Sequence, residues 1–278
     1  MASLLALFSS VLWGSADFFG GLLTKKYKAF AVTAMSQFFG LITAVVIVIA
    51  TNGYKAPTLN WNGYFLPGLL AGIAGFAGLV SFYSGLSTGR MGVVSPISTL
   101  STLIPLVVAF IGGERPRVIQ FVGIVIVLVG VFCGSGPDVV KGLPLKPLLF
   151  GLGAALGFGT ALALMAQGSK TSALLTMTSM RVVTVTIAAL VAIKFRTVGG
   201  FKSKDISLLI FIGITDFMAN YLLGVATTKG LVSIAMVLGS LFPMMTALLA
   251  FKFLRERLHR VQYLGICLAV VGVSLISL

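Results

Sequence analysis

The chain has 278 residues, of which 58% are hydrophobic and only 9% are charged, and its mean hydropathy is +1.10. Because a soluble domain carries about 25% charged residues, this composition argues against a soluble enzyme, a disordered protein and a secreted disulfide scaffold. The formal net charge is +14, but the basic residues lie mostly in short gaps between apolar runs, as in loops that face anionic lipid headgroups. We therefore expect an integral membrane protein that has the lipid bilayer as a partner and binds no nucleic acid.

Apolar runs long enough to cross a bilayer, which takes about 20 residues, follow one another along the whole chain. The sequence predicts an all-α fold of ten membrane-spanning helices, near residues 3–23, 30–51, 63–86, 91–112, 117–135, 146–167, 173–195, 206–227, 231–253 and 260–277. The N-terminal segment 1–4 has no basic residue, so we expect it to begin the first span rather than a signal peptide.

The orientation in the membrane is predicted from the loops. An even number of spans places both termini on the same side. Most Lys and Arg residues lie in the loops that follow the odd-numbered spans. Because positively charged loops stay in the cytoplasm, this distribution places the termini outside the cell.

An internal repeat is the strongest functional signal in the sequence. Its matching residues are Glu114-Arg115 with Glu256-Arg257, Gln120 with Gln262, Gly123-Ile124 with Gly265-Ile266, and Val129-Gly130-Val131 with Val271-Gly272-Val273. Upstream, Tyr83 aligns with Tyr221 and Pro105 with Pro243. The chain therefore divides into a first five-helix repeat (1–135), a connecting loop (136–147) and a second five-helix repeat (148–278). Because five is odd, the second repeat enters the membrane from the opposite side, which is the inverted topology of many secondary transporters.

Three elements carry a family resemblance: Leu12-Trp13-Gly14-Ser15, the Gly-Leu-Ser-Thr-Gly to Pro105 stretch with its counterpart ending at Pro243, and the doubled Glu-Arg before a Gln-x-x-Gly-Ile helix. With them the chain resembles the EamA-type transporters of the drug/metabolite transporter superfamily. The resemblance implies export or exchange of small metabolites such as amino acids, and a cavity lined by spans 1, 3, 4, 6, 8 and 9. It also implies that both termini lie in the cytoplasm, whereas the distribution of loop charges places them outside.

Ionisable side chains inside a membrane are costly, so each is a candidate functional residue. Arg181 and Asp216 both fall near mid-depth of their spans and could form an ion pair, which would be structural or part of a substrate or proton site. Asp17 lies one helical turn after Trp13, so both project to one face. We expect Asp17 either to bind a substrate ammonium or carry a proton, or to reach Lys25 or Lys26 at the interface.

Polar-tipped and kink-forming residues complete the prediction. The expected cavity residues are Trp13, Asp17, Tyr83, Ser95, Asp216, Asn220 and Tyr221, with helix packing as the alternative role for Asn220. Pro96 kinks a helix, and Pro105 and Pro243 are predicted to be matched hinges. Glu114 and Glu256 are expected to form weak interfacial ion pairs with their Arg neighbours.

No catalytic, metal or nucleotide-binding motif is present in the sequence, and a single histidine, His259, excludes a multi-histidine metal site. We expect no enzyme activity, no metal and no cofactor. The sequence predicts a secondary transporter or facilitator of small polar or amphipathic metabolites, working by alternating access in the cytoplasmic membrane of a prokaryote. Proton coupling through Asp17 or Asp216 is one option, and a monomer would suffice. The alternative is a channel or a lipid flippase or scramblase.

Overall fold

The computed structural model describes residues 1–86, 91–135, 145–196, 199–254 and 259–278, and all regular secondary structure within them is helical. The α-helices are α1 (Ala2–Thr24), α2 (Ala29–Ala50), α3 (Phe65–Leu86), α4 (Met91–Ser98), α5 (Leu103–Ile111), α6 (Val118–Gly134), α7 (Leu145–Phe195), α8 (Ser203–Lys229), α9 (Val232–Gly239), α10 (Phe242–Leu254) and α11 (Arg260–Ser277). A 3₁₀ turn, η1 (Thr99–Thr102), separates α4 from α5.

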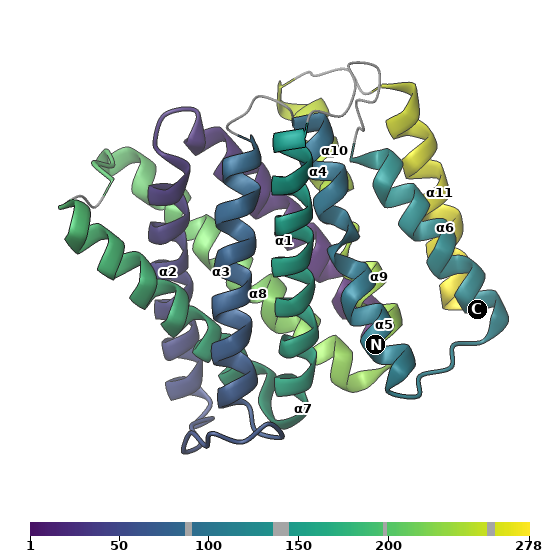
Figure 1. Cartoon of the computed structure of the whole chain (residues 1–278), viewed down its shortest axis with the longest axis horizontal. Helices are drawn as coiled ribbons and strands as arrows, with labels where there is room; N and C mark the ends of the chain where they lie inside the picture. Colours follow the sequence, from purple (N-terminus) through teal and green to yellow (C-terminus); the bar gives the residue numbers. More distant parts are fainter. Residues whose placement is uncertain (87–90, 136–144, 197–198, 255–258) are drawn as a thin grey trace.

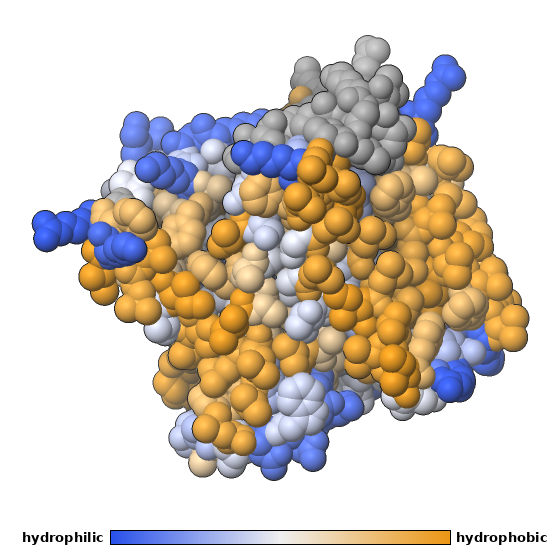
Figure 2. All heavy atoms as spheres, in the orientation of Figure 1, coloured by the Kyte–Doolittle hydropathy of each residue, from blue (hydrophilic) through white to orange (hydrophobic). Residues whose placement is uncertain are grey.

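The bundle has the surface of a membrane protein. Among the described residues, seven helical stretches are long and apolar enough to cross a bilayer, and two shorter apolar stretches cover 96–111 and 118–134. Figure 2 shows the apolar side chains as a belt, with hydrophilic residues gathered toward the two ends of the molecule. An all-helical structure satisfies the backbone hydrogen bonds within each segment, as lipid requires.

The long α7 consists of two helices joined at Ser172, whose φ of −164° and ψ of 109° are not helical. The Ser172 hydroxyl accepts a hydrogen bond from the Leu175 backbone N–H at 3.3 Å and so begins the second helix. The two parts, 145–171 and 173–195, correspond to the sixth and seventh predicted spans.

The predicted fourth and ninth spans are both interrupted before a proline. Pro105 lies in the first turn of α5, after η1, and Pro243 lies in the first turn of α10, after α9 ends at Gly239. In the first turn of a helix the backbone N–H has no partner within the helix, so a proline at that position removes no helical hydrogen bond. The two breaks therefore occur at equivalent positions of the repeat.

Helices α6 and α11 lie side by side and antiparallel at one edge of the bundle (Figure 1), and they contact each other at glycine residues. A Cβ added at Gly123 would lie 2.8 Å from the Gly272 carbonyl oxygen, and one at Gly130 would lie 2.8 Å from the Ala269 nitrogen. Only glycine permits this close approach of two backbones.

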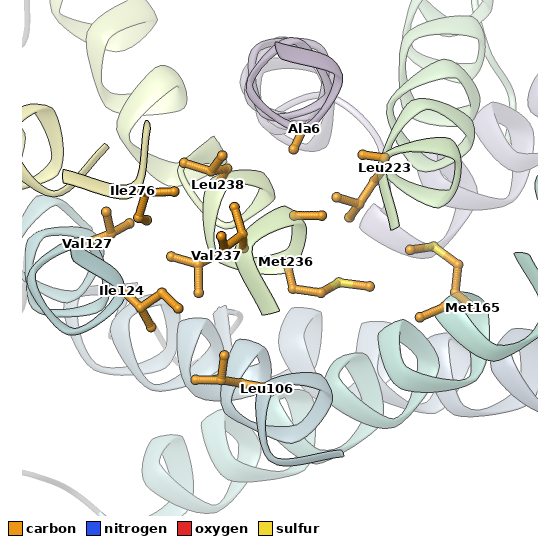
Figure 3. Close-up of a cluster of buried hydrophobic side chains, with 14 of the residues drawn as sticks. Ala6, Leu106, Ile124, Val127, Met165, Leu223, Met236, Val237, Leu238 and Ile276 are labelled. Atoms are coloured by element: carbon orange, nitrogen blue, oxygen red, sulfur yellow. The ribbon is translucent and has the colours of Figure 1, made fainter. Parts of the chain in front are cut away.

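Helix α9 is buried on all sides at the centre of the bundle. Its residues from Ser233 to Gly239 are all buried, and Figure 3 shows Met236, Val237 and Leu238 among side chains of the surrounding helices. Gly230, two residues before α9, lies against Ala2. The N-terminus of α9 is therefore at the end of the bundle that holds both chain termini (Figure 1).

Candidate functional site

An ion pair inside the bundle connects α7 to α8. The Arg181 Nη2 atom lies 2.7 Å from Asp216 Oδ2, and the two side chains are 7% and 22% exposed. Both residues stand within the apolar stretches that could span a membrane. A pair so placed is held by its mutual attraction and by additional hydrogen bonds, since water is scarce there.

Three further side chains hold Asp216. Trp13 Nε1 of α1 donates a hydrogen bond to Oδ1 at 3.1 Å, and Gln37 Nε2 of α2 donates to Oδ2 at 3.0 Å. Asn220, one turn along α8, donates to the Asp216 backbone oxygen at 2.7 Å. Helices α1, α2, α7 and α8 thus converge on one carboxylate, which we call the Asp216 network.

Gln37 connects the two charges of the network. Its Oε1 accepts a hydrogen bond from Arg181 Nη1, and the Thr184 hydroxyl lies 3.4 Å from the same oxygen. The guanidinium also packs against α2 one turn further along, where a Cβ at Gly40 would lie in ordinary van der Waals contact with Arg181 Nε, at 3.5 Å. Gln37 and Thr184 were missed in the sequence, although an amide in an otherwise apolar span needs a partner and could have signalled Gln37.

Asp17 belongs to the inward face of α1. Ala6, Ser10, Trp13 and Asp17 follow one another at helical spacing, and their exposure rises along the helix. Ala6 is 0% and Ser10 4% exposed, Trp13 is half-buried and Asp17 is exposed. This face is therefore closed at the end with the termini and open near Asp17.

The exposure of Asp17 is not exposure to lipid. The apolar side chains that α1 turns outward are Leu4, Phe8 and Val11, on a different stripe of the helix. A Cβ added at Gly20 or Gly21, three and four residues after Asp17, would meet no atom of the described residues within 4 Å, so within that part of the chain the space next to Asp17 is open.

Asp17 accepts no hydrogen bond from any residue that the structure describes. It lies close enough to Asp216 for an electrostatic interaction between the two carboxyl groups. Lys26, an expected interfacial partner, pairs instead with Asp205 at 3.3 Å. Asp205 also accepts a hydrogen bond from the Tyr27 hydroxyl at 2.7 Å.

Other predicted cavity residues stand apart from the network. Tyr221 is half-buried and stacks on Phe217 with ring centroids 6.4 Å apart, and it packs against the core cluster around α9. The side chains of Tyr83 and Ser95 lie outside the described residues. Pro105 and Pro243 are at the breaks of their spans, and neither is a member of the network.

Glu114 makes a different contact from the one expected. Its Oε1 and Oε2 accept hydrogen bonds from the backbone N–H groups of Val232 at 2.6 Å and Ser233 at 2.9 Å. The expected ion pair with Arg115 was wrong, because Arg115 donates to the backbone oxygens of Phe110 and Glu114. A carboxylate at a helix N-terminus satisfies free N–H groups and the helix dipole together, which a surface arginine cannot match. Glu256, its repeat equivalent, lies outside the described residues.

An apolar groove of about 640 Å³ lies on another face, lined by α2, α7 and the segment before α3. Its lining includes Val48, Tyr64 and Val182 but no member of the Asp216 network. The groove is therefore separate from the candidate site.

Comparisons with known proteins agree with this architecture. The EamA-like transporter family matches residues 1–135 and 145–278. A solved structure titled "Crystal structure of protein" is 18% identical and superimposes with a TM-score of 0.80, covering 99% of this chain and 94% of its own. This likeness shows the fold. No match was found among curated proteins. The chain belongs to the EamA-like transporter family, whose members are membrane transporters of small molecules.

Proposed function

We propose that the protein is a secondary transporter or facilitator that moves small polar or amphipathic metabolites by alternating access, in the cytoplasmic membrane of a prokaryote. One observation carries the proposal: the Asp216 network lies between four helices inside the bundle, and Asp17 faces open space beside it. Polar groups at membrane depth on an inward face are the usual composition of a substrate site.

Ten spans in two inverted repeats are part of the proposal, and the α6–α11 contacts support them. In the repeat, Gly123 is equivalent to Gly265 and Gly272 is equivalent to Gly130. A symmetric arrangement that has a contact between Gly123 and Gly272 must therefore also have one between Gly265 and Gly130, and both contacts are present. Equivalent helices that run antiparallel with matched contacts are expected of a pseudo-two-fold axis in the membrane plane.

The two ends of the bundle differ, as alternating access requires of a carrier in one state. At the end with the termini, α9 fills the centre and Glu114 holds its N-terminus. Near Asp17 the inward face of α1 is open. In the opposite state we expect α9 to move away from Ala6, and the second end to close over Asp17.

The Asp216 network would position the substrate next to Asp17 and would connect α1, α2, α7 and α8 with one another during transport. Asp216 is already bound by Arg181, Gln37 and Trp13, so Asp17 is the group free to bind a solute or to carry a proton.

Counterflow in proteoliposomes tests the proposal, with a panel of amines, amino acids, nucleosides and sugars measured with and without a proton gradient. A carrier gives saturable counterflow, whereas a channel or scramblase gives flux that rises linearly with solute. We expect Asp17→Asn to abolish counterflow and Ser15→Ala, on the same helix, to leave it unchanged. Linear flux, or full activity of Asp17→Asn, would contradict the mechanism.

A further inference from the structure

The accessible part of the candidate site carries negative charge. Asp17 is exposed to the open space, and the Asp216 side chain is 22% exposed. These two carboxyl groups also interact with each other. A solute that reaches the depth of Asp17 from the open end therefore meets carboxyl groups there.

The one cation of the Asp216 network cannot be offered to a solute. Arg181 is 7% exposed, and its two Nη atoms are directed at Asp216 and Gln37. Its Nε faces Gly40 and has no hydrogen-bond partner among the described residues, but the atom is buried where α2 and α8 touch at Gly40 and Gly213, so a solute cannot reach it. Arg181 neutralises Asp216, so within the described part of the chain no cation compensates the formal charge of Asp17.

The lysines that directly follow α1 lie too far from Asp17 or are already paired. Lys25 follows eight residues later, roughly 12 Å along the helix. Lys26 makes its ion pair with Asp205 at 3.3 Å. Among the residues that the structure describes, none pairs with Asp17.

An aromatic ring adjoins the uncompensated carboxylate. Trp13 lies one turn from Asp17 on the same face of α1, and its ring nitrogen is fixed by Asp216. Phe242 touches the Trp13 ring edge-on, with centroids 5.8 Å apart. A carboxylate next to an indole is a composition that binds ammonium groups, through charge and through cation–π attraction.

We infer that the site takes a small organic cation, an amine that carries no carboxylate, in preference to a zwitterionic amino acid or an organic acid. This inference rests on the proposed transport function and names its substrate class. An ammonium would compensate Asp17 and leave the interior neutral. A carboxylate would face Asp17 while Arg181, the one cation of the network, is already paired with Asp216, and such unpaired charge discriminates against it.

Binding is tested with three solutes of one skeleton: 2-phenylethylamine, phenylalanine and 3-phenylpropionate. Trp61 lies in the connection between α2 and α3 and is 52% exposed, so Trp61→Phe leaves Trp13 as the single fluorescent indole. We expect 2-phenylethylamine to change Trp13 emission with an affinity at least tenfold higher than that of the other two solutes. Asp17→Asn should abolish this preference, whereas Asp17→Glu should keep it.

Transport of the same series separates the two proposals. Saturable counterflow of the amine, competed poorly by phenylalanine, supports both. Saturable counterflow in which phenylalanine or 3-phenylpropionate equals or exceeds the amine overturns the substrate class and leaves the carrier function standing. No saturable counterflow for any solute of the series or of the wider panel overturns the carrier function, and the substrate class with it.

Discussion

Asp216 is the residue on which the polar interior depends. It accepts hydrogen bonds from Trp13 and Gln37 and forms an ion pair with Arg181. Each partner is needed, because the Asp216 carboxylate has little water to solvate it inside the bundle. The effect of replacing a neighbour of Asp216 therefore depends on whether the replacement leaves the carboxylate without its cation or without one hydrogen bond.

Replacing Arg181 should strongly destabilise the protein. Arg181→Met leaves the Asp216 carboxylate without its cation, and removing one member of a buried pair costs about 3 kcal/mol or more. We expect a large fall in the unfolding temperature in detergent. Lys194→Met, at the exposed end of α7, serves as the control and should change the unfolding temperature little. The double variant Arg181→Met/Asp216→Leu should regain part of the loss, and no recovery would mean that the two charges act separately.

Replacing Trp13 should affect the site more than the fold. Trp13→Phe keeps an aromatic ring but removes the hydrogen bond to Asp216, which is worth about 1.5–3 kcal/mol when the acceptor is charged. We expect the KM for counterflow to rise about tenfold, while the unfolding temperature changes less than in Arg181→Met. An unchanged KM would show that the indole N–H has no part in positioning Asp216 for the substrate.

At the scale of elements, the structure rests on helices that contact through glycine and on helices that are held at their ends. The α6–α11 pair belongs to the first kind, and α9 with Glu114 belongs to the second. The glycine contact between α6 and α11 holds one edge of the bundle together. The hydrogen bonds between Glu114 and α9 are contacts that a moving helix can form and break.

A methyl group between α6 and α11 should loosen the bundle. In Gly272→Ala the new Cβ would lie 2.7 Å from Val127 Cγ2 and 2.8 Å from the Gly123 oxygen. Such overpacking costs about 1–3 kcal/mol, measured as a lower unfolding temperature in detergent. Gly21→Ala has no atom within 4 Å of its Cβ and should be as stable as the parent. Equal stability of both variants would contradict the close backbone contact.

Removing the carboxylate of Glu114 should open the closed end. Two hydrogen bonds from a carboxylate to α9 would be lost, and about 1.4 kcal/mol corresponds to a tenfold change in the balance of states. In a background without Cys133 and Cys267, Ala6→Cys should react slowly with a membrane-impermeant maleimide, because position 6 is fully buried. We expect Glu114→Ala to raise that rate about tenfold. An unchanged rate would show that Glu114 only supports α9 structurally.

At the scale of the whole molecule, the distribution of charge decides how the protein sits in the membrane. Both termini lie at one end, together with the Glu114–α9 contact (Figure 1). The loops at the other end include Lys25, Lys26 and Lys202, near the open side of the site. If positive charge stays inside, the open end faces the cytoplasm.

Reporter fusions test this orientation. With the termini outside, a C-terminal alkaline phosphatase fusion should be active and a C-terminal green fluorescent protein fusion dark. The reverse pattern would place the termini in the cytoplasm, as the family resemblance implies, and would put the open end outside. A phosphatase inserted in the connecting segment between α2 and α3 should behave like the C-terminal one, because that segment lies at the same end.

The sequence by itself determined the all-helical membrane class and the family, because hydropathy and residue spacing are local properties of the chain. It also singled out Arg181, Asp216 and Asp17, since a charge in an apolar span stands out without any structure. Helix boundaries followed within a few residues, and even the interruption at Ser172 fell in the predicted gap between two spans.

Only the tertiary structure decided which polar groups meet. Gln37 and Arg181 are 144 residues apart, and Glu114 finds its partners in the other half of the chain. Such contacts depend on how helices are rotated and placed against one another. That arrangement is set by small residues such as Gly40 and Gly272 at the interfaces, where side-chain volume decides the fit and hydropathy carries no information.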